Sequence, residues 1–225
     1  RKVRGGKANE IFRFANDCYP ESLCPHIASS KEFWIAVGRG MARYFESEHL
    51  FPDFSDRCNE WYKVKLTMFG TAVLPDGQRI CATPSRYNKP QFDFADCTID
   101  KDKIFARCLL FCRMSLKKEA NSQVLFEREV AFINILSLHT SEELLTCHGQ
   151  CQDVSPILLH GKFKRLSTGL LALKCIPISQ LRERITAIRD RIADWKPDTN
   201  SMSFPNGEWY FILDPANFSG VEVYS

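Results

Sequence analysis

The residues best suited to metal chemistry are cysteines in two separate stretches of the chain. Cys18 and Cys24 lie in one stretch and Cys147 and Cys151 in the other, each with a histidine nearby. Thiolate and imidazole are the ligands of structural zinc sites, so the two stretches could together bind zinc. Such sites favour two pairs with about two to four residues between ligands, and only the pairs Cys147/Cys151 and Cys108/Cys112 approach that spacing. We therefore predict no metal or other cofactor, with a zinc site as the alternative.

The sequence shows no catalytic signature around its other cysteines. Cys108 and Cys112 lie in an apolar stretch typical of a strand, where positions four apart share a face but are too far apart to grip one ion readily. No nucleophile elbow accompanies any of the 10 cysteines or 5 histidines. Gly38-Arg39-Gly40 falls inside a predicted helix, not between a strand and a helix where a phosphate loop forms. We expect no enzyme.

Basic side chains interleaved with an aromatic residue indicate a different chemistry, the binding of nucleic acid. Two groups are present, one formed by Arg79, Arg86, Tyr87 and Lys89 and the other by Lys162, Lys164 and Arg165. On a β-surface such residues can pair with phosphates and stack on bases. A solvated sheet face has the same composition, so both interpretations stay open.

The overall composition is that of an ordinary globular protein. The 225 residues are 44% hydrophobic and 25% charged, and 30 Lys and Arg against 27 Asp and Glu leave a net charge of +3. This balance is far from that of a dedicated nucleic-acid domain, so any basic surface must be local. No run approaches the roughly 18 apolar residues of a membrane span, and we expect no membrane partner.

The chain begins at Arg1 without an initiator methionine or a secretory signal, so we interpret it as a piece of a longer protein. Several cysteines lie in or beside apolar, strand-like stretches: Cys81, Cys97, Cys108, Cys112 and Cys175. Free cysteine in such a place behaves as a small buried hydrophobe. We therefore predict reduced thiols in an intracellular compartment.

A helical and loop-rich segment is predicted over residues 1–58. Ser29 has a glutamate three residues later, in the form of a capping box, and apolar residues then recur at helical spacing. The pattern predicts a helix near 30–47. Gly38 and Gly40 weaken it by about 1 kcal/mol each against alanine. One of them should therefore mark the close approach of another backbone.

Residues 59–225 are predicted to form a β-rich domain. An alternation of period two begins at Trp61, and Pro75-Asp76-Gly77 is typical of a hairpin turn. Residues 104–114 are apolar on both faces, as a central strand should be. Further strand candidates are 92–95, 129–138, 157–164, 170–178 and the segment after Asn206-Gly207. Short strands at this spacing indicate a barrel-like or strongly bent sheet.

The clearest helical pattern covers 179–196. Successive spacings of four, three and four residues separate Leu181, Ile185, Ile188 and Ile192, which would place them on one stripe. The stripe is short for a coiled coil, so packing onto the sheet is favoured, with self-association through these residues as the alternative. The predicted fold class is α+β: a mainly antiparallel, barrel-like or strongly bent sheet with N-terminal helices and a late amphipathic helix.

Three runs in the middle of the chain form a pattern of their own. They are Arg79-Ile-Cys-Ala-Thr-Pro-Ser-Arg86, Lys89-Pro-Gln-Phe-Asp-Phe94 and Phe105-Ala-Arg-Cys-Leu-Leu-Phe111. This pattern resembles one in transposon proteins of the Plavaka and KDZ type. There the runs are similar to R-x-x-A-T-P-x-[WFY], an aromatic-Asp-aromatic strand, and a strand ending A-R-x-L-L-F.

The resemblance implies a β-rich region downstream of the acidic-triad nuclease core of such transposases, which act on DNA in the nucleus. The matching positions belong to the accessory region, so no catalytic residue is carried over. The predicted function is a non-catalytic accessory domain of a transposase-like protein that binds DNA or assembles with other chains. Two alternatives stay open: an interaction module of an unrelated intracellular protein, and a cysteine- or zinc-dependent enzyme.

Overall fold

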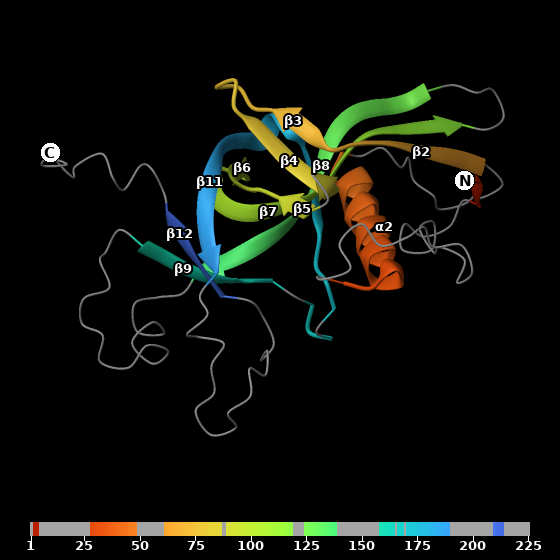
Figure 1. The fold of residues 1–225 in the computed structure, drawn as a ribbon. Coiled ribbons are helices and arrows are strands. Elements are labelled where there is room, and N and C mark those ends of the chain that lie inside the picture. Colours follow the sequence, from red (N-terminus) through yellow and green to blue (C-terminus); the bar gives the residue numbers. More distant parts are fainter. Residues whose placement is uncertain are drawn as a thin grey trace, which may run out of the picture.

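The computed structural model describes residues 2–4, 28–48, 61–86, 89–118, 124–138, 158–164, 166–168, 170–189 and 209–213. Their secondary structure is mostly antiparallel sheet with one α-helix (Figure 1). The mainly antiparallel character that the sequence predicts is therefore confirmed. Additional N-terminal helices are not seen in the described part of residues 1–58. No described helix is long and apolar enough to cross a membrane.

The elements follow one another along the chain in a simple order. They are β1 (Lys2–Arg4), α2 (Ser30–Ser47), β2 (Trp61–Phe69), β3 (Thr71–Val73), β4 (Arg79–Arg86), β5 (Lys89–Phe92), β6 (Phe94–Ile99), β7 (Asp102–Lys118), β8 (Val124–Leu138), β9 (Leu158–Phe163), β10 (Lys174–Pro177), the 3-10 turn η1 (Ile178–Gln180), β11 (Leu181–Arg189) and β12 (Trp209–Leu213). A three-stranded sheet contains β3, β4 and β5, and a nine-stranded sheet contains the other strands.

The long strands β7 and β8 form the centre of the larger sheet. They pair with each other, while β6 and β2 pair with the two halves of the other edge of β7. From β7 the pairings lead through β6, β11, β12, β9 and β8, and β8 also pairs with β7. β10 pairs with the middle of β8, and β1 pairs with β2.

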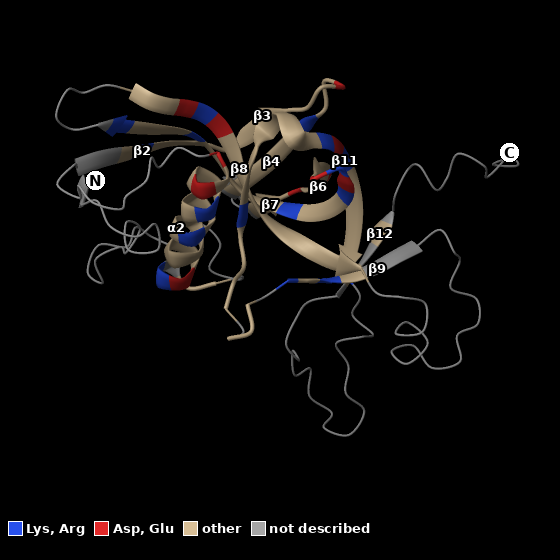
Figure 2. Ribbon diagram, turned by 180° about the vertical axis from the view of Figure 1, so that it is seen from behind, with Lys and Arg blue, Asp and Glu red and all other residues tan. Residues whose placement is uncertain are grey.

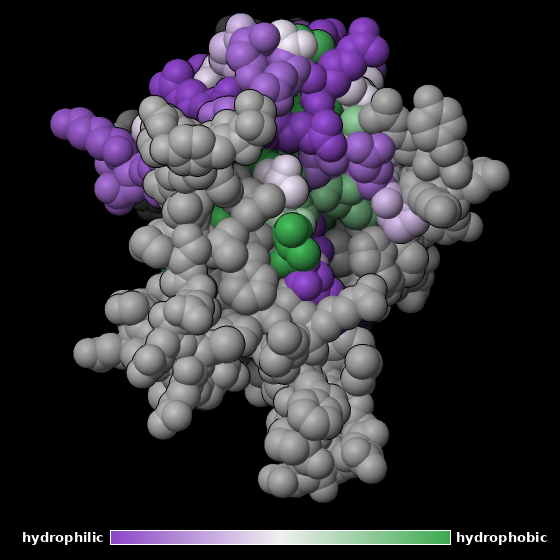
Figure 3. Space-filling model, turned by 60° about the vertical axis from the view of Figure 1, so that its left-hand side comes forward, coloured by the Kyte–Doolittle hydropathy of each residue, from purple (hydrophilic) through white to green (hydrophobic). Residues whose placement is uncertain are grey.

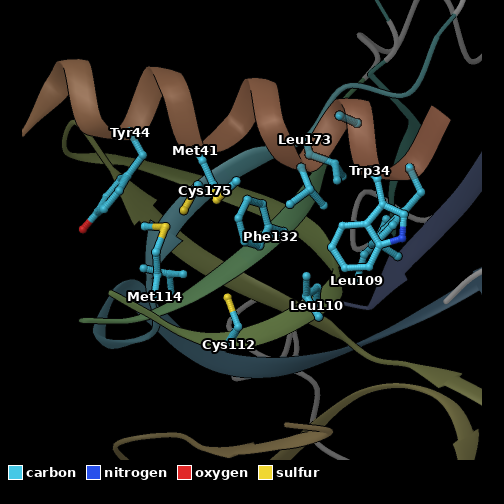
Figure 4. Close-up of a cluster of buried hydrophobic side chains, with 14 of the residues drawn as sticks. Trp34, Met41, Tyr44, Leu109, Leu110, Cys112, Met114, Phe132, Leu173 and Cys175 are labelled. Atoms are coloured by element: carbon cyan, nitrogen blue, oxygen red, sulfur yellow. The ribbon is translucent and has the colours of Figure 1, made fainter. Parts of the chain in front are cut away.

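Buried side chains form three clusters on the faces of this sheet. The α2 cluster joins α2 to β7, β8 and β10 and includes Phe33, Phe45, Met114 and Phe132 (Figure 4). The β4 cluster joins the small sheet to the larger one and includes Ile80, Cys97, Phe111 and Ile133. The β12 cluster includes Phe105, Leu136, Phe163, Ile185 and Tyr210. Each cluster therefore contains residues of β7 and β8 together with residues of an element that packs against them.

A bulge in β7 allows this strand to serve all three clusters. Its pairing with β8 steps from Cys108 opposite Ile133 to Leu110 opposite Phe132, so β7 carries one extra residue there. The alternation of faces shifts at that point. Cys108 consequently lies in the β4 cluster and Cys112 in the α2 cluster. The expectation that these two thiols share a face, based on their spacing of four, is wrong because of the bulge.

The helix α2 begins where the sequence predicts. Ser29 is the N-cap residue, and its Oγ accepts a hydrogen bond from the Glu32 amide at 3.2 Å. Gly40 marks the closest approach of α2 to its neighbours, because a Cβ built there would lie 3.3 Å from the Phe132 ring and 3.4 Å from the Leu173 carbonyl oxygen. The predicted backbone approach at one of the two glycines is confirmed at Gly40.

Elements from both predicted segments pack together. β1 and α2 belong to residues 1–58, whereas β2 and the remaining strands belong to residues 59–225. β1 extends the large sheet by pairing with β2, and α2 shares a cluster with β7 and β8. The division of the chain at residue 58 stays a prediction.

The predicted hairpin turn between β3 and β4 is confirmed. Gly77 has a φ of 84°, in the left-handed region that glycine adopts without strain. Its amide donates to the Leu74 carbonyl oxygen at 2.9 Å, and the Gln78 amide donates to Asp76 Oδ1 at 2.9 Å. The aspartate and glycine of the turn therefore have the roles that their residue types suggest.

The predicted helix over 179–196 is wrong where the structure describes it, because η1 and β11 occupy this segment. Leu181 and Ile185 are an even number of residues apart, so they share a strand face as readily as a helix stripe. Both are buried. Ile188 is an odd number of residues from Ile185 and is 54% exposed. The predicted stripe does not form, and Ile192 lies outside the described residues.

A buried cation links four strands within the β12 cluster. Arg107 is 7% exposed, and its guanidinium carbon lies 3.9 Å from the centroid of the Phe163 ring. The guanidinium also faces the rings of Phe94 and Tyr210, and its Nη1 donates to Tyr210 Oη at 3.3 Å. Guanidinium stacks on aromatic faces, which stabilises the charge away from water. Arg107 thus connects β7 to β6, β9 and β12.

Gly161 of β9 provides a test of the β8–β9 pairing. A Cβ built at Gly161 would lie 2.8 Å from the Ser137 carbonyl oxygen, so one strand would have to shift. We expect Gly161→Ala to lower the free energy of unfolding by about 1–3 kcal/mol, the usual cost of overpacking. Urea denaturation measures this, with Thr186→Ala on the exposed face of β11 as control. Equal stability of Gly161→Ala and the control would contradict the pairing.

Candidate nucleic-acid interface

The structure separates the predicted basic residues into two groups on different sheets. Arg79 begins β4 in the three-stranded sheet and is exposed. Lys162 lies in β9, and Lys164 follows β9 as an exposed residue. Four members of the prediction have side chains outside the described part of the structure: Arg86, Tyr87, Lys89 and Arg165. The two groups therefore have to be assessed separately.

A cavity of about 410 Å³ lies beside the second group, and we call it the α2–β10 cavity. The helix contributes Gly40, Arg43, Tyr44 and Ser47, and the rest of the lining comes from Ile135, Lys164 and residues 172–175. The helix α2 and strand β10 therefore form two of its walls, and the end of β8 and the chain after β9 complete it. A volume of this size is within the range of small-molecule sites, roughly 300–1,000 Å³.

A second hollow, of about 300 Å³, shares Lys164 with the α2–β10 cavity. It is lined by residues 103–105 of β7 and 135–138 of β8. Because Lys164 and Ile135 line both spaces, the two hollows lie next to each other. We refer to the two hollows together as the depression; their lining includes residues of α2, β10, β8 and β7 and Lys164 after β9.

Positive charge gathers around these two hollows. Arg43, Lys164 and Lys174 line the cavity and Lys103 lines the second hollow, and the described residues that line these two spaces include no acidic one. Figure 2 shows basic positions on α2 and on the chain next to β9. Among the described residues, Arg43 and Lys164 form no ion pair. The depression is therefore suited to an anion.

The two lysines that do have acidic neighbours keep much of their exposure. Lys174 Nζ lies 3.9 Å from Asp100 Oδ2, and Lys103 Nζ lies 3.7 Å from Asp96 Oδ2. Each lysine side chain is 43% exposed. The Asp100 side chain is 90% exposed, and such a solvated pair is weak, about 0–1 kcal/mol, so Lys174 can exchange it for a ligand, whereas the Asp96 side chain that pairs with Lys103 is only 11% exposed.

The buried side-chain amide of Asn134 holds two residues of the cavity lining in place. Asn134 is 1% exposed, and its Nδ2 donates to the carbonyl oxygens of Lys164 at 3.0 Å and Ala172 at 2.8 Å. The Lys164 amide also donates to the Ile135 carbonyl oxygen at 2.8 Å. A side-chain amide has two donor hydrogens, so Asn134 can satisfy both carbonyls at once. It therefore holds together the two ends of the segment 164–172.

The same segment is also attached to α2. The Leu171 amide donates to Glu32 Oε1 at 2.7 Å, a charge-assisted bond to the first turn of the helix. At the other end of α2, Arg128 Nη1 donates to Tyr44 Oη at 3.0 Å and to Glu48 Oε2 at 3.2 Å. Burial raises the pKa of Tyr44 above its usual value, so the phenol stays protonated. The cavity walls are thus held at both ends of the helix.

Three buried thiols, those of Cys97, Cys112 and Cys175, are poor nucleophiles near neutral pH. Burial raises the pKa of Cys97 and of Cys112 to about 12, and it raises the pKa of Cys175, in the cavity wall, well above its usual value. The thiolate is the nucleophile, and these thiols are almost wholly protonated near neutral pH. All the cysteines that the structure describes are free and buried. None of them has the environment of a catalytic cysteine.

The predicted alternative of a zinc site lies outside the described residues, where Cys18, Cys24, Cys147 and Cys151 all fall. Within the described residues, no group of three or more His, Cys, Asp or Glu side chains could hold a metal ion. Cys108 and Cys112 point to opposite faces of the sheet, as the bulge in β7 requires.

The sequence patterns identified only part of this site. Lys164 was predicted from the basic strand and turn, but Arg43, Lys103 and Lys174 were not. Asn134 carried a usable signal, because it is a polar residue within the apolar run 130–136. A polar side chain in a buried strand must find partners, which points to an organising role.

Comparisons with known proteins do not identify a relative. No family model, no curated protein and no solved structure matches this chain. The function is therefore argued from the geometry of the site.

The raised thiol pKa values predict a loss of stability in alkali. A buried thiol keeps its proton up to about pH 12, whereas its ordinary pKa is 9.0. The contribution of these thiols to the free energy of unfolding is therefore complete below about pH 9. It is lost as the pH rises from there towards the folded pKa, because the unfolded chain releases its thiol protons first. Urea denaturation between about pH 8 and 10.5 measures the decline. Cys112→Ala should flatten it; an identical decline in that variant would contradict the assignment.

Proposed function

We propose that this chain is a non-catalytic accessory domain that binds DNA through the depression between α2, β10 and the end of β9. The observation that carries the proposal is the position of Lys164, which lines two adjoining hollows together with Arg43, Lys103 and Lys174. Clustered cations, two of which (Arg43 and Lys164) form no ion pair among the described residues, favour a ligand with several negative charges. A nucleic-acid backbone supplies such charges at regular intervals.

The side chains of the site are suited to binding and not to catalysis. The thiol in the cavity wall has a raised pKa, and the phenol of Tyr44 is engaged by Arg128. A catalytic site needs a nucleophile or base next to an orienting group. Among the residues that the structure describes, those that line the α2–β10 cavity include no carboxylate and no histidine.

The transposase-like origin rests on the resemblance over residues 79–111. This segment forms β4, β5, β6 and the first half of β7. The aspartate of its aromatic-Asp-aromatic run is Asp93, whose Oδ2 accepts the Cys81 amide at 2.8 Å and whose Oδ1 lies 3.3 Å from Arg184 Nη2. Asp93 therefore joins β4 to β11, which gives the residue a structural reason to be present. A nuclear location belongs to the same proposal.

A protein-interaction module is less well supported. The exposed apolar side chains include Ile188 on β11 and Met68 on β2, at 54% and 51% exposure. They lie on different strands, and scattered apolar residues are ordinary on protein surfaces. In Figure 3 the described surface on the β11 side is mostly hydrophilic, with small hydrophobic areas. The side chains of Trp61 and Trp209 lie outside the described residues.

A salt titration of DNA binding tests the proposed function. We expect a fluorescent oligonucleotide to bind at low salt and to dissociate as salt rises. The double substitution Arg43→Gln and Lys164→Gln should weaken binding and reduce the slope of log K against log salt by about 2, roughly one for each phosphate contact. Fluorescence anisotropy measures both quantities.

Two comparison variants make the result specific. Arg113→Gln removes a cation that is already paired with Glu129 at 2.8 Å, and we expect it to bind as the wild type does. The double substitution Arg79→Gln and Arg86→Gln tests the other predicted group. The proposal is wrong if binding is undetectable at low salt, or if it does not weaken as salt rises.

A further inference from the structure

The α2–β10 cavity differs from a simple phosphate site in the way its side chains are distributed. Its exposed members are Arg43, Ser47 and Lys164, with Lys174 half-buried, whereas Leu173, Tyr44 and Cys175 are buried. The cations therefore lie at the rim and the apolar groups form the floor. A phosphate needs only the rim, because it gains nothing from contact with an apolar floor.

We infer that this cavity holds one unpaired nucleobase, while the phosphates on either side of it are bound by the cations at the rim. This inference rests on the proposed function and names the form of nucleic acid that is bound. The volume of about 410 Å³ is sufficient for a base and its sugar. A base in a duplex is stacked and paired, so only a single strand, or a nucleotide turned out of a duplex, can supply one.

The apolar floor of the cavity predicts that the site distinguishes only weakly between different nucleobases. The buried polar groups nearby are already engaged: Asn134 Nδ2 donates to two carbonyl oxygens, and Tyr44 Oη accepts from Arg128. Reading the edge of a base requires donors and acceptors that point at it. Contact with an apolar floor accepts any base, because every base has a flat apolar face.

The cavity is held in shape by contacts within the chain. Asn134 joins Lys164 to Ala172, and Glu32 holds the Leu171 amide. Gly40 allows α2 to approach the Leu173 carbonyl oxygen, which sets the width between helix and floor. A preformed cavity reduces the entropy lost on binding. The site should therefore bind without reshaping the sheet.

A comparison of single-stranded and duplex probes tests the inference on the intact chain. A 12-nucleotide oligo-dT strand should bind about tenfold more tightly than a mixed duplex of the same length, since base contacts add to the phosphate contacts. Ala172→Trp, which fills the cavity from its wall, should remove this preference, so that the single strand and the duplex bind with equal affinity. Thr186→Trp, on the exposed face of β11, is the matched control and should keep the preference.

A second filling variant and a spectroscopic probe guard against a folding defect. Ser47→Trp places the same bulk at the exposed end of α2, where it also lines the cavity. A 2-aminopurine in the single strand should change its fluorescence with the wild type and not with either filled variant. Equal affinity for single strand and duplex, or filled variants that keep the preference, would overturn base insertion but leave the proposed function standing. Absence of binding to both probes would overturn the proposed function itself.

Discussion

The fold depends on β7 being paired on both edges and covered on both faces along most of its length. One strand can meet that demand only if most of its side chains are apolar on both sides, and the bulge between Cys108 and Leu110 changes which positions face the α2 cluster and which face the β4 cluster. Arg107 is a buried charge within this largely apolar strand. Its guanidinium lies against aromatic rings of neighbouring strands, and these contacts stabilise the buried charge.

The candidate site follows from the same arrangement. β8 pairs with β7 on one edge, and β10 and β9 pair with successive parts of its other edge. The chain between β9 and β10 must therefore cross the gap between them, and Asn134 satisfies the carbonyl groups that the crossing leaves without strand partners. The helix α2 covers this crossing. Apolar residues consequently form the floor of the α2–β10 cavity, and Arg43 and Lys164 lie at the surface.

Elements with a local signal could be predicted from the sequence, and those that depend on distant contacts could not. The cap at Ser29 and the turn at Gly77 act through neighbouring residues, so both were located correctly. β11 was mistaken for a helix because Leu181 and Ile185 fit either period, and only its pairing with β6 and β12 decides between them. Within the site, Lys164 belongs to a basic run, but Arg43 reaches it only through the packing of α2.

The central claim is that nucleic acid binds where α2 faces β10 and not on the small sheet that carries Arg79. Backbone amide chemical shifts of the isotope-labelled chain, followed during titration with an oligo-dT strand, test this most directly. We expect the largest changes at residues 40–47 and 164–175, with little change at 79–83. Changes confined to the small sheet, or none at all, would contradict it.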